Sequence, residues 1–260
     1  MRHTRLTFLT AATLITDAAP PAAAERLITS LSQHRVMVTS SFTGGEVVLF
    51  GGIESEAGVL PLQGKYDIAV TVAGPRQDIV VFRKERVLGI WVNYDSRVVE
   101  NAPSYLAVLT NRPLDAIASA QTRRRLQLGL DNIPLSQRSD HGSADAAGNE
   151  TFRAAFLKLK EDRQLYRQES NGVTFLTPTL FRASIPLPAD VPIGTYEVDA
   201  TLFADGTAIA HTPSALEIYK AGFEQVVTTI AQTYGLIYGV VTAAMAILTG
   251  WFASVVFRRD

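Results

Sequence analysis

The sequence predicts a mainly β protein: an immunoglobulin-like β-sandwich with a helical insertion, followed by one C-terminal transmembrane helix. Three observations lead to this fold class. Short β-rich runs alternate with turn residues in the first half of the chain and return after residue 173. A segment of helical periodicity lies between them. A long apolar stretch that carries no charge precedes the last three residues.

Between residues 35 and 109, β-forming residues are grouped in short runs that glycine and proline turns separate. One run covers residues 47–50, and residues 66–72 alternate with a period of two. Residues 79–82 and 87–92 continue the pattern. Regular short strands of this kind are typical of a sandwich of two sheets.

A helical insertion is predicted from about residue 113 to residue 169. Pro113 suits the first turn of a helix, and Gly129 offers its end. Residues 131–148 lack periodicity and predict an exposed loop, after which Asn149 can cap a second helix that continues through Glu169. Its apolar side chains fall on one face and should pack on the sheet. They are Phe152, Ala155, Phe156, Leu159 and Tyr166.

Strands return at residues 173–185, and the clearest β pattern of the chain covers residues 196–202. Apolar and polar side chains alternate there, so one face of this strand should be buried and the other wet. Residues 204–206 predict a hairpin turn, and residues 215–219 predict a last strand that leads toward the C-terminal segment. Two abutting subdomains are the alternative to a single sandwich.

Both ends of the chain carry membrane-related signals. Residues 1–24 combine basic residues, a short apolar stretch and three alanines, which predicts a cleavable export signal; an uncleaved, weakly amphipathic N-terminus is the alternative. Residues 233–257 are uncharged and long enough to span a bilayer, and residues 258–260 predict a short cytoplasmic tail. Residues 25–224 would then form a periplasmic domain at the inner membrane.

Composition excludes several classes of protein. A net charge of −1 gives no electrostatic basis for nucleic-acid binding. The chain has no cysteine, which excludes a disulfide scaffold, thiol chemistry and thiolate metal sites.

No catalytic or cofactor motif meets its physical requirements. The segment from Gly58 to Lys65 has five residues between its glycines instead of four, so it is not a phosphate-binding loop. The four histidines lack the spacing of metal ligands. Asp140 and His141 lie near serines in a predicted loop without rigid support. We therefore expect no enzymatic activity, no cofactor and no metal site.

Small side chains form one stripe along the predicted transmembrane helix. Bulky residues occupy the rest of the circumference at about 100° per residue. Helices in lipid pack closely over such stripes, so the partner should be a second copy or another integral membrane protein. The predicted helix-packing residues are Gly235, Gly239, Ala243, Ala246, Gly250 and Ser254.

A second candidate surface is basic. Alternate residues of a strand share a face, and arginine donates a planar fork to oxyanions, so this surface suits an anion or a partner protein. The alternative interpretation is a solvated strand edge that is kept polar against aggregation. Its residues are Arg76, Arg83, Lys84, Arg86 and Trp91.

The chain contains a set of distinctive motifs: Glu25-Arg26-Leu27, Phe50-Gly51, Gly74-Pro75-Arg76-Gln77, the run from Arg83 to Asn93, Pro103-Ser104-Tyr105-Leu106-Ala107-Val108 and Asn111-Arg112-Pro113-Leu114. Together these motifs resemble a family of alphaproteobacterial transmembrane proteins of unknown function. The resemblance covers essentially the whole mature chain. It implies an inner-membrane location with a periplasmic domain, supplies no catalytic residues, and suggests a small-anion exporter of the sulfite-exporter kind as the class of partner.

Three functional hypotheses follow from these observations. The first is a non-enzymatic accessory or assembly partner of an integral membrane protein such as a small-anion exporter, docked through the small-residue stripe. The second is a homodimeric envelope sensor or structural protein in which the stripe pairs two copies. The third is a periplasmic enzyme with a dispersed site.

Overall fold

The structure, a computed structural model, describes residues 25–54, 66–139, 146–220 and 234–256. It confirms the mainly β class. The predicted export signal and the predicted tail lie outside the described residues, as does the segment from Gly58 to Lys65.

A first sheet has four strands, and each neighbouring pair is antiparallel. Its strands, in spatial order, are β1 (Arg26–Leu31), β3 (Gly45–Glu54), β11 (Leu180–Leu187) and β10 (Val173–Phe175).

A second sheet has six strands and is mostly antiparallel. The exceptions are its two edges, where β2 runs parallel to β13 and β9 runs parallel to β7. Its strands, in spatial order, are β2 (Arg35–Val38), β13 (Thr207–Lys220), β12 (Gly194–Ala204), β4 (Tyr66–Ala73), β7 (Leu106–Thr110) and β9 (Tyr166–Glu169).

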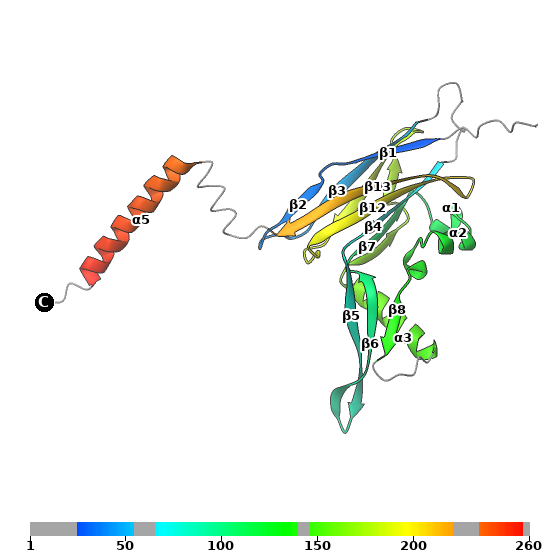
Figure 1. The fold of residues 1–260 in the computed structure, drawn as a ribbon, viewed down its shortest axis with the longest axis horizontal. Coiled ribbons are helices and arrows are strands. Elements are labelled where there is room, and N and C mark those ends of the chain that lie inside the picture. Colours follow the sequence, from blue (N-terminus) through cyan, green and yellow to red (C-terminus); the bar gives the residue numbers. More distant parts are fainter. Residues whose placement is uncertain (1–24, 55–65, 140–145, 221–233, 257–260) are drawn as a thin grey trace, which may run out of the picture.

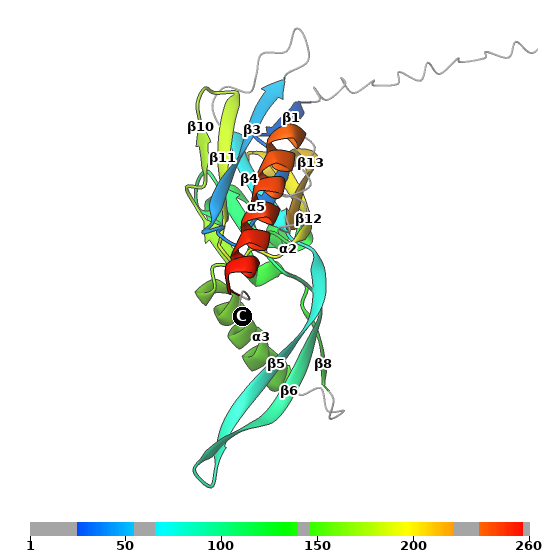
Figure 2. The same cartoon turned by 90° about the vertical axis from the view of Figure 1, so that its left-hand side faces the viewer.

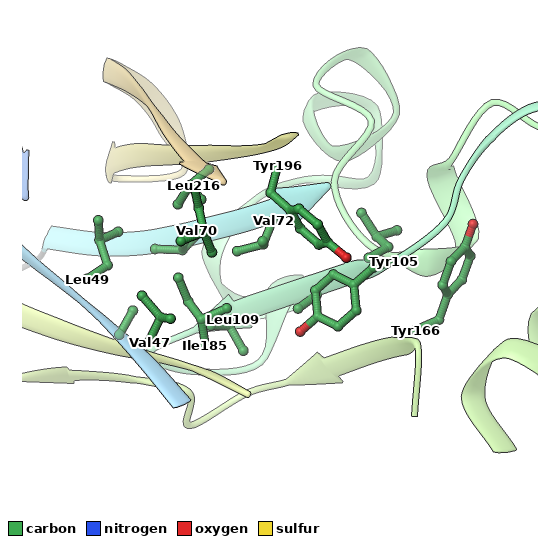
Figure 3. Packing of buried hydrophobic residues seen from close by; sticks show 14 of the residues in the cluster. Val47, Leu49, Val70, Val72, Tyr105, Leu109, Tyr166, Ile185, Tyr196 and Leu216 are labelled. Atoms are coloured by element: carbon green, nitrogen blue, oxygen red, sulfur yellow. The ribbon is translucent and has the colours of Figure 1, made fainter. Parts of the chain in front are cut away.

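The two sheets share one hydrophobic core (Figure 3). Val47 and Ile185 of the first sheet and Val70 and Leu216 of the second are fully buried in it. The alternation predicted for residues 196–202 is confirmed, because the apolar side chains of this segment are buried. Burial of these apolar faces provides the main driving force that holds the sheets together.

A third sheet, in the order β5-β6-β8, extends away from the other two (Figures 1 and 2). It consists of β5 (Arg76–Val87), β6 (Ile90–Pro103) and β8 (Ser136–Ser139). The expectation of short strands was wrong here, since β5 has 12 residues and β6 has 14. Neither glycine nor proline interrupts the chain from Arg76 to Val87, so nothing ends the strand before the turn at Leu88 and Gly89.

The predicted first helix is divided into α1 (Leu114–Ile117) and α2 (Ala120–Arg125). Ala118 adopts an extended conformation after α1, and the Ser119 side chain then accepts a hydrogen bond from the Thr122 amide to cap α2. The predicted exposed loop contains a short 3₁₀ turn, η1 (Leu130–Asn132), and strand β8. This loop prediction was therefore partly wrong.

The second predicted helix, α3 (Ala146–Asp162), begins before Asn149 and ends well before Glu169. Phe152 and Phe156 are buried as predicted, whereas Leu159 is 52% exposed. Tyr166 is buried, but it belongs to β9. The chain leaves the helix there because residues 166–169 pair with β7 at the edge of the six-stranded sheet.

The last element is helix α5 (Gly235–Val256), whose described side chains are all exposed. Among the residues that the structure describes, no helix is both long enough and apolar enough to cross a membrane. The predicted span over residues 233–257 extends beyond these residues, and the side chains at 237, 238, 255 and 256 are not described.

Candidate functional site: the projecting hairpin

Strands β5 and β6 form a long antiparallel hairpin, paired from Arg76 and Pro103 at its base to Val87 and Ile90 at its tip. The connecting residues Leu88 and Gly89 have φ angles of 51° and 85°. Two central residues with positive φ are the signature of a type I′ turn, whose twist suits two paired strands. The hairpin therefore needs no contact at its tip to hold its geometry.

The base of the hairpin is held by α3. Val81 and Val99 are buried there, together with the guanidinium group of Arg97. Arg97 lies over the ring of Phe152, 5.0 Å from the ring centroid, and its Nη1 donates to Asp95 Oδ1 at 2.7 Å. These contacts offset part of the desolvation of the arginine, whose Nε has no hydrogen-bond partner among the described residues, and they fix the base of the hairpin against α3.

The outer half of the hairpin exposes large apolar side chains. Leu88 is 99% exposed, Ile90 68% and Trp91 67%, and Val87 and Val92 are also exposed. Successive pairs of an antiparallel ladder point to opposite faces, so Trp91 extends from one face and Val87 and Ile90 extend from the other. Both faces of the tip and its end therefore carry apolar side chains, and Arg86 lies opposite Trp91 on the same face.

Three basic residues lie beside this tip. Arg83 is paired with Glu85 at 2.8 Å between Nη2 and Oε1, and its guanidinium is 5.9 Å from the Tyr94 ring centroid. Lys84 and Arg86 take part in no salt bridge within the described part of the chain. Their charges are available to an external anion.

The structure thus brings together four of the five residues of the predicted basic surface: Arg83, Lys84, Arg86 and Trp91. Arg76 does not join them, because it lies at the base of the hairpin and donates to the Asn101 carbonyl at 3.4 Å. Arg76 instead lines a separate hollow of about 250 Å³ on the outer face of the six-stranded sheet.

Sequence reasoning missed the apolar members of this surface, above all Leu88 and Ile90. A Leu-Gly pair between two β-forming runs was the available signal, since two-residue loops connect hairpins. We name the outer hairpin surface formed by residues 83–92 the hairpin tip.

Within the described part of the chain, no other element covers the predicted helix-packing stripe on α5. A Cβ added at Gly235, Gly239 or Gly250 would meet no atom within 4 Å. Ala243, Ala246 and Ser254, the other predicted members, are exposed.

A polar hollow of about 610 Å³ is lined by Asp67, Arg112 and Asp115 among others. Asp67 is buried, and it accepts hydrogen bonds from Arg112 Nε at 2.6 Å and Asn111 Nδ2 at 2.9 Å. Arg112 Nη2 also bonds the same carboxylate. These bonds fasten the start of the helical insertion to β4, which is a structural role.

Another buried charge, Lys160, ties α3 to the junction between β6 and β7. Its Nζ donates to the Ser104 carbonyl at 3.0 Å and lies 5.5 Å from the Tyr166 ring centroid and 5.8 Å from that of Phe156. Burial lowers the pKa of Lys160, and repulsion by Arg163 adds to this effect. The ammonium group is thus engaged by a backbone carbonyl and two aromatic rings.

The described residues contain no group of three or more potential metal-binding side chains. His211 Nε2 lies 3.1 Å from Asp199 Oδ1 in an exposed pair. The segment with Asp140 and His141 lies outside the described residues.

Comparison with known proteins places the chain in a family. The matching family model is described as "Putative transmembrane protein (Alph_Pro_TM)", and the match covers residues 26–259, from β1 to beyond α5. A search of curated proteins found no match. Because the family model covers nearly the whole chain and agrees with the motif resemblance, the protein belongs to the Alph_Pro_TM family.

Proposed function

We propose that this protein is tethered to the inner membrane by residues 233–257, with its β-sheet body on the periplasmic side, and that it acts by binding rather than by catalysis. The observation that carries the proposal is the contrast between the two parts of the chain. The sheets bury a core of their own, whereas α5 exposes every described side chain, most of them apolar. An apolar helix whose described side chains are all exposed is suited to lipid and to other helices.

For the β-sheet body we infer an immunoglobulin-like sandwich with a large insertion, and the strand order supports this inference. In such folds one sheet has the order A-B-E-D and the other contains G, F and C. The order β1-β3-β11-β10 matches the first, and β13-β12-β4 matches the second. The insertion would then comprise the hairpin and the helices between β4 and β10.

The binding role rests on how the buried charged groups are engaged. Asp67 is bonded by Arg112 and Asn111, and Lys160 is bonded by a backbone carbonyl. Both clusters contribute to the fold. The uncovered small stripe of α5 instead suits a second helix, because glycine lets backbones approach closely in lipid.

The partner proposed for this stripe is an integral membrane protein such as a small-anion exporter, and the protein would be its accessory or assembly subunit. A homodimeric sensor or structural protein is the alternative, in which α5 of a second copy covers the same stripe.

Affinity purification from mild detergent tests the proposal. Wild type should recover an integral membrane protein that Gly239→Leu and Gly250→Leu fail to recover, because leucine separates the helix backbones. Val241→Leu is the matched control, since Val241 lies about 200° around the helix from Gly239 and its side chain is already large. Recovery of a differently tagged second copy would support the homodimer. Identical recovery by all four proteins would contradict docking through the stripe.

A further inference from the structure

We propose that the hairpin tip inserts into the interface of a lipid bilayer that carries anionic headgroups. This inference rests on the proposed tether only for bringing the tip close to a membrane. The occupant is a lipid surface, and a protein partner is an outcome that the test distinguishes.

The first argument is the distribution of apolar side chains. Trp91 extends from one face of the hairpin, Val87 and Ile90 from the other, and Leu88 from the end. A protein that docks against a hairpin covers one face, whereas lipid surrounds an inserted tip on every side. Apolar side chains on both faces and at the end of this tip therefore fit an apolar medium better than a flat interface.

The second argument is the position of the charges. Arg86, Lys84 and Arg83 are two, four and five residues from Leu88 along the strand. At about 3.4 Å per residue they lie about 7, 14 and 17 Å behind the end of the tip. A tip buried about 5–10 Å into the interface places Arg86 among the headgroups and the other two just above them. Residues 83–92 contain these three cations and one acidic residue, Glu85, so this segment carries a net charge of +2.

The third argument is the residue at the turn. Leu88 is a branched apolar residue in the left-handed region, where asparagine, aspartate and glycine are normally found. The β12–β13 hairpin of the same chain makes its turn with Asp205 and Gly206, at φ angles of 46° and 81°. With 99% of its surface exposed, Leu88 gains almost nothing from its own protein. Strain of this kind is typical of residues retained for a function.

The fourth argument is location. The base of the hairpin adjoins the end of the sheet from which the chain leaves toward α5. A Cβ added at Gly194 would lie 2.8 Å from Pro75 Cγ, and Gly194 pairs with Ile218, close to the end of β13 at Lys220. Residues 221–233 reach at most about 45 Å, and the hairpin is about 40 Å long. A membrane that holds the C-terminal anchor is therefore within reach of the tip.

The test uses the full-length chain reconstituted in vesicles. The chain has no cysteine, so single-cysteine variants can each carry one polarity-sensitive fluorophore. Ile90→Cys reports on the hairpin tip, Met245→Cys reports on the proposed anchor, and Thr207→Cys reports on the opposite hairpin as a control. All three positions are exposed. Each variant is measured in phosphatidylcholine vesicles with and without phosphatidylglycerol.

We expect the Ile90 probe to enter an apolar environment in the anionic vesicles while the Thr207 probe stays in water. Replacing Lys84 and Arg86 by glutamine should lower the ratio of inserted to free tip about fivefold for each charge removed. Leu88→Asn should also reduce insertion. The turn of this variant has the favoured Asn-Gly sequence, so its domain should unfold at a higher temperature than that of the wild type. A loss of insertion in this variant therefore cannot be explained by misfolding.

Three outcomes would overturn the inference or its support. If the Ile90 probe stays in water in both kinds of vesicle while the Met245 probe is buried, the tip does not insert, although the tether stands. If the Met245 probe also stays in water, the proposed function fails. If the Ile90 probe is buried in lipid-free detergent in proportion to protein concentration, the tip binds protein and not lipid.

Discussion

Gly51 shows how one residue sets the spacing inside the first sheet. It lies opposite Phe181, and a Cβ added at Gly51 would be only 2.1 Å from Phe181 Cζ. The ring therefore occupies the space in which any other residue at position 51 would place its side chain.

We expect Gly51→Ala to lower the free energy of unfolding by about 1–3 kcal/mol, because the Phe181 ring must leave its packed position. Denaturant unfolding measures this change. Gly52→Ala is the matched control, since a Cβ at Gly52 meets no atom within 4 Å. Equal losses for the two variants would show that the phenylalanine contact is not the cause.

The turn residue Leu88 allows a second prediction at this scale. Leu88→Asn should raise the free energy of unfolding by about 1 kcal/mol, because asparagine tolerates the left-handed conformation that leucine adopts there at a cost. Thermal and denaturant unfolding measure the gain. A loss of stability would mean that Leu88 makes contacts that its 99% exposure does not indicate.

At the scale of elements, helix α3 decides how firmly the hairpin is held. Phe152 is 3% exposed and carries the Arg97 guanidinium on its ring. We expect Phe152→Ala to cost about 3–5 kcal/mol, because it leaves a cavity and removes the contact that compensates a buried charge. Denaturant unfolding and amide exchange in β5 and β6 are the measurements.

Leu159→Ala on the same helix is the control, because Leu159 is 52% exposed and its truncation leaves no cavity. Its cost should stay below about 1 kcal/mol. Faster exchange in β5 and β6 for Phe152→Ala alone would locate the defect at the base of the hairpin, and similar exchange in both variants would contradict this role of α3.

The element boundaries also show why part of the fold escaped prediction. Residues 166–169 follow a helix and carry two charged side chains, so their sequence alone extends the helical pattern. They form β9 because β7 offers an unpaired edge beside them. Pairing with a segment some 60 positions away in the sequence overrides the local preference.

At the scale of the whole molecule, three buried tyrosines link the sheets to their connections. Each hydroxyl donates to a proline carbonyl, and burial raises the pKa of each tyrosine. The tyrosines are Tyr105, Tyr166 and Tyr196, and the carbonyls belong to Pro186, Pro103 and Pro192, respectively.

These tyrosines predict a loss of stability in alkali. Unfolded tyrosine loses its proton near pH 10, whereas the folded groups keep theirs, so stability is complete below pH 10 and falls as the pH rises further. Three protons give a slope of about 4 kcal/mol per pH unit. Lys160 has the opposite effect: it makes the stability rise with pH, and only below about pH 10.5, because its pKa is lowered in the folded state.

Denaturant unfolding between pH 8 and pH 12 measures this slope. Tyr196→Phe should reduce it by about a third, because phenylalanine has no proton to lose. An unchanged slope in this variant would show that Tyr196 does not contribute to alkaline unfolding.

The amino-acid pattern was enough to predict the mainly β class, the hairpin turn at residues 204–206, the buried face of residues 196–202 and the membership of the family. These features depend on the local period of apolar residues, on turn residues and on motifs, all of which are properties of short stretches of sequence. The local pattern did not show that β5 and β6 leave the two packed sheets, that Arg76 is separated from Arg83, or that Leu88 ends an exposed tip. These features follow from strand pairing between distant segments, which a local period does not specify.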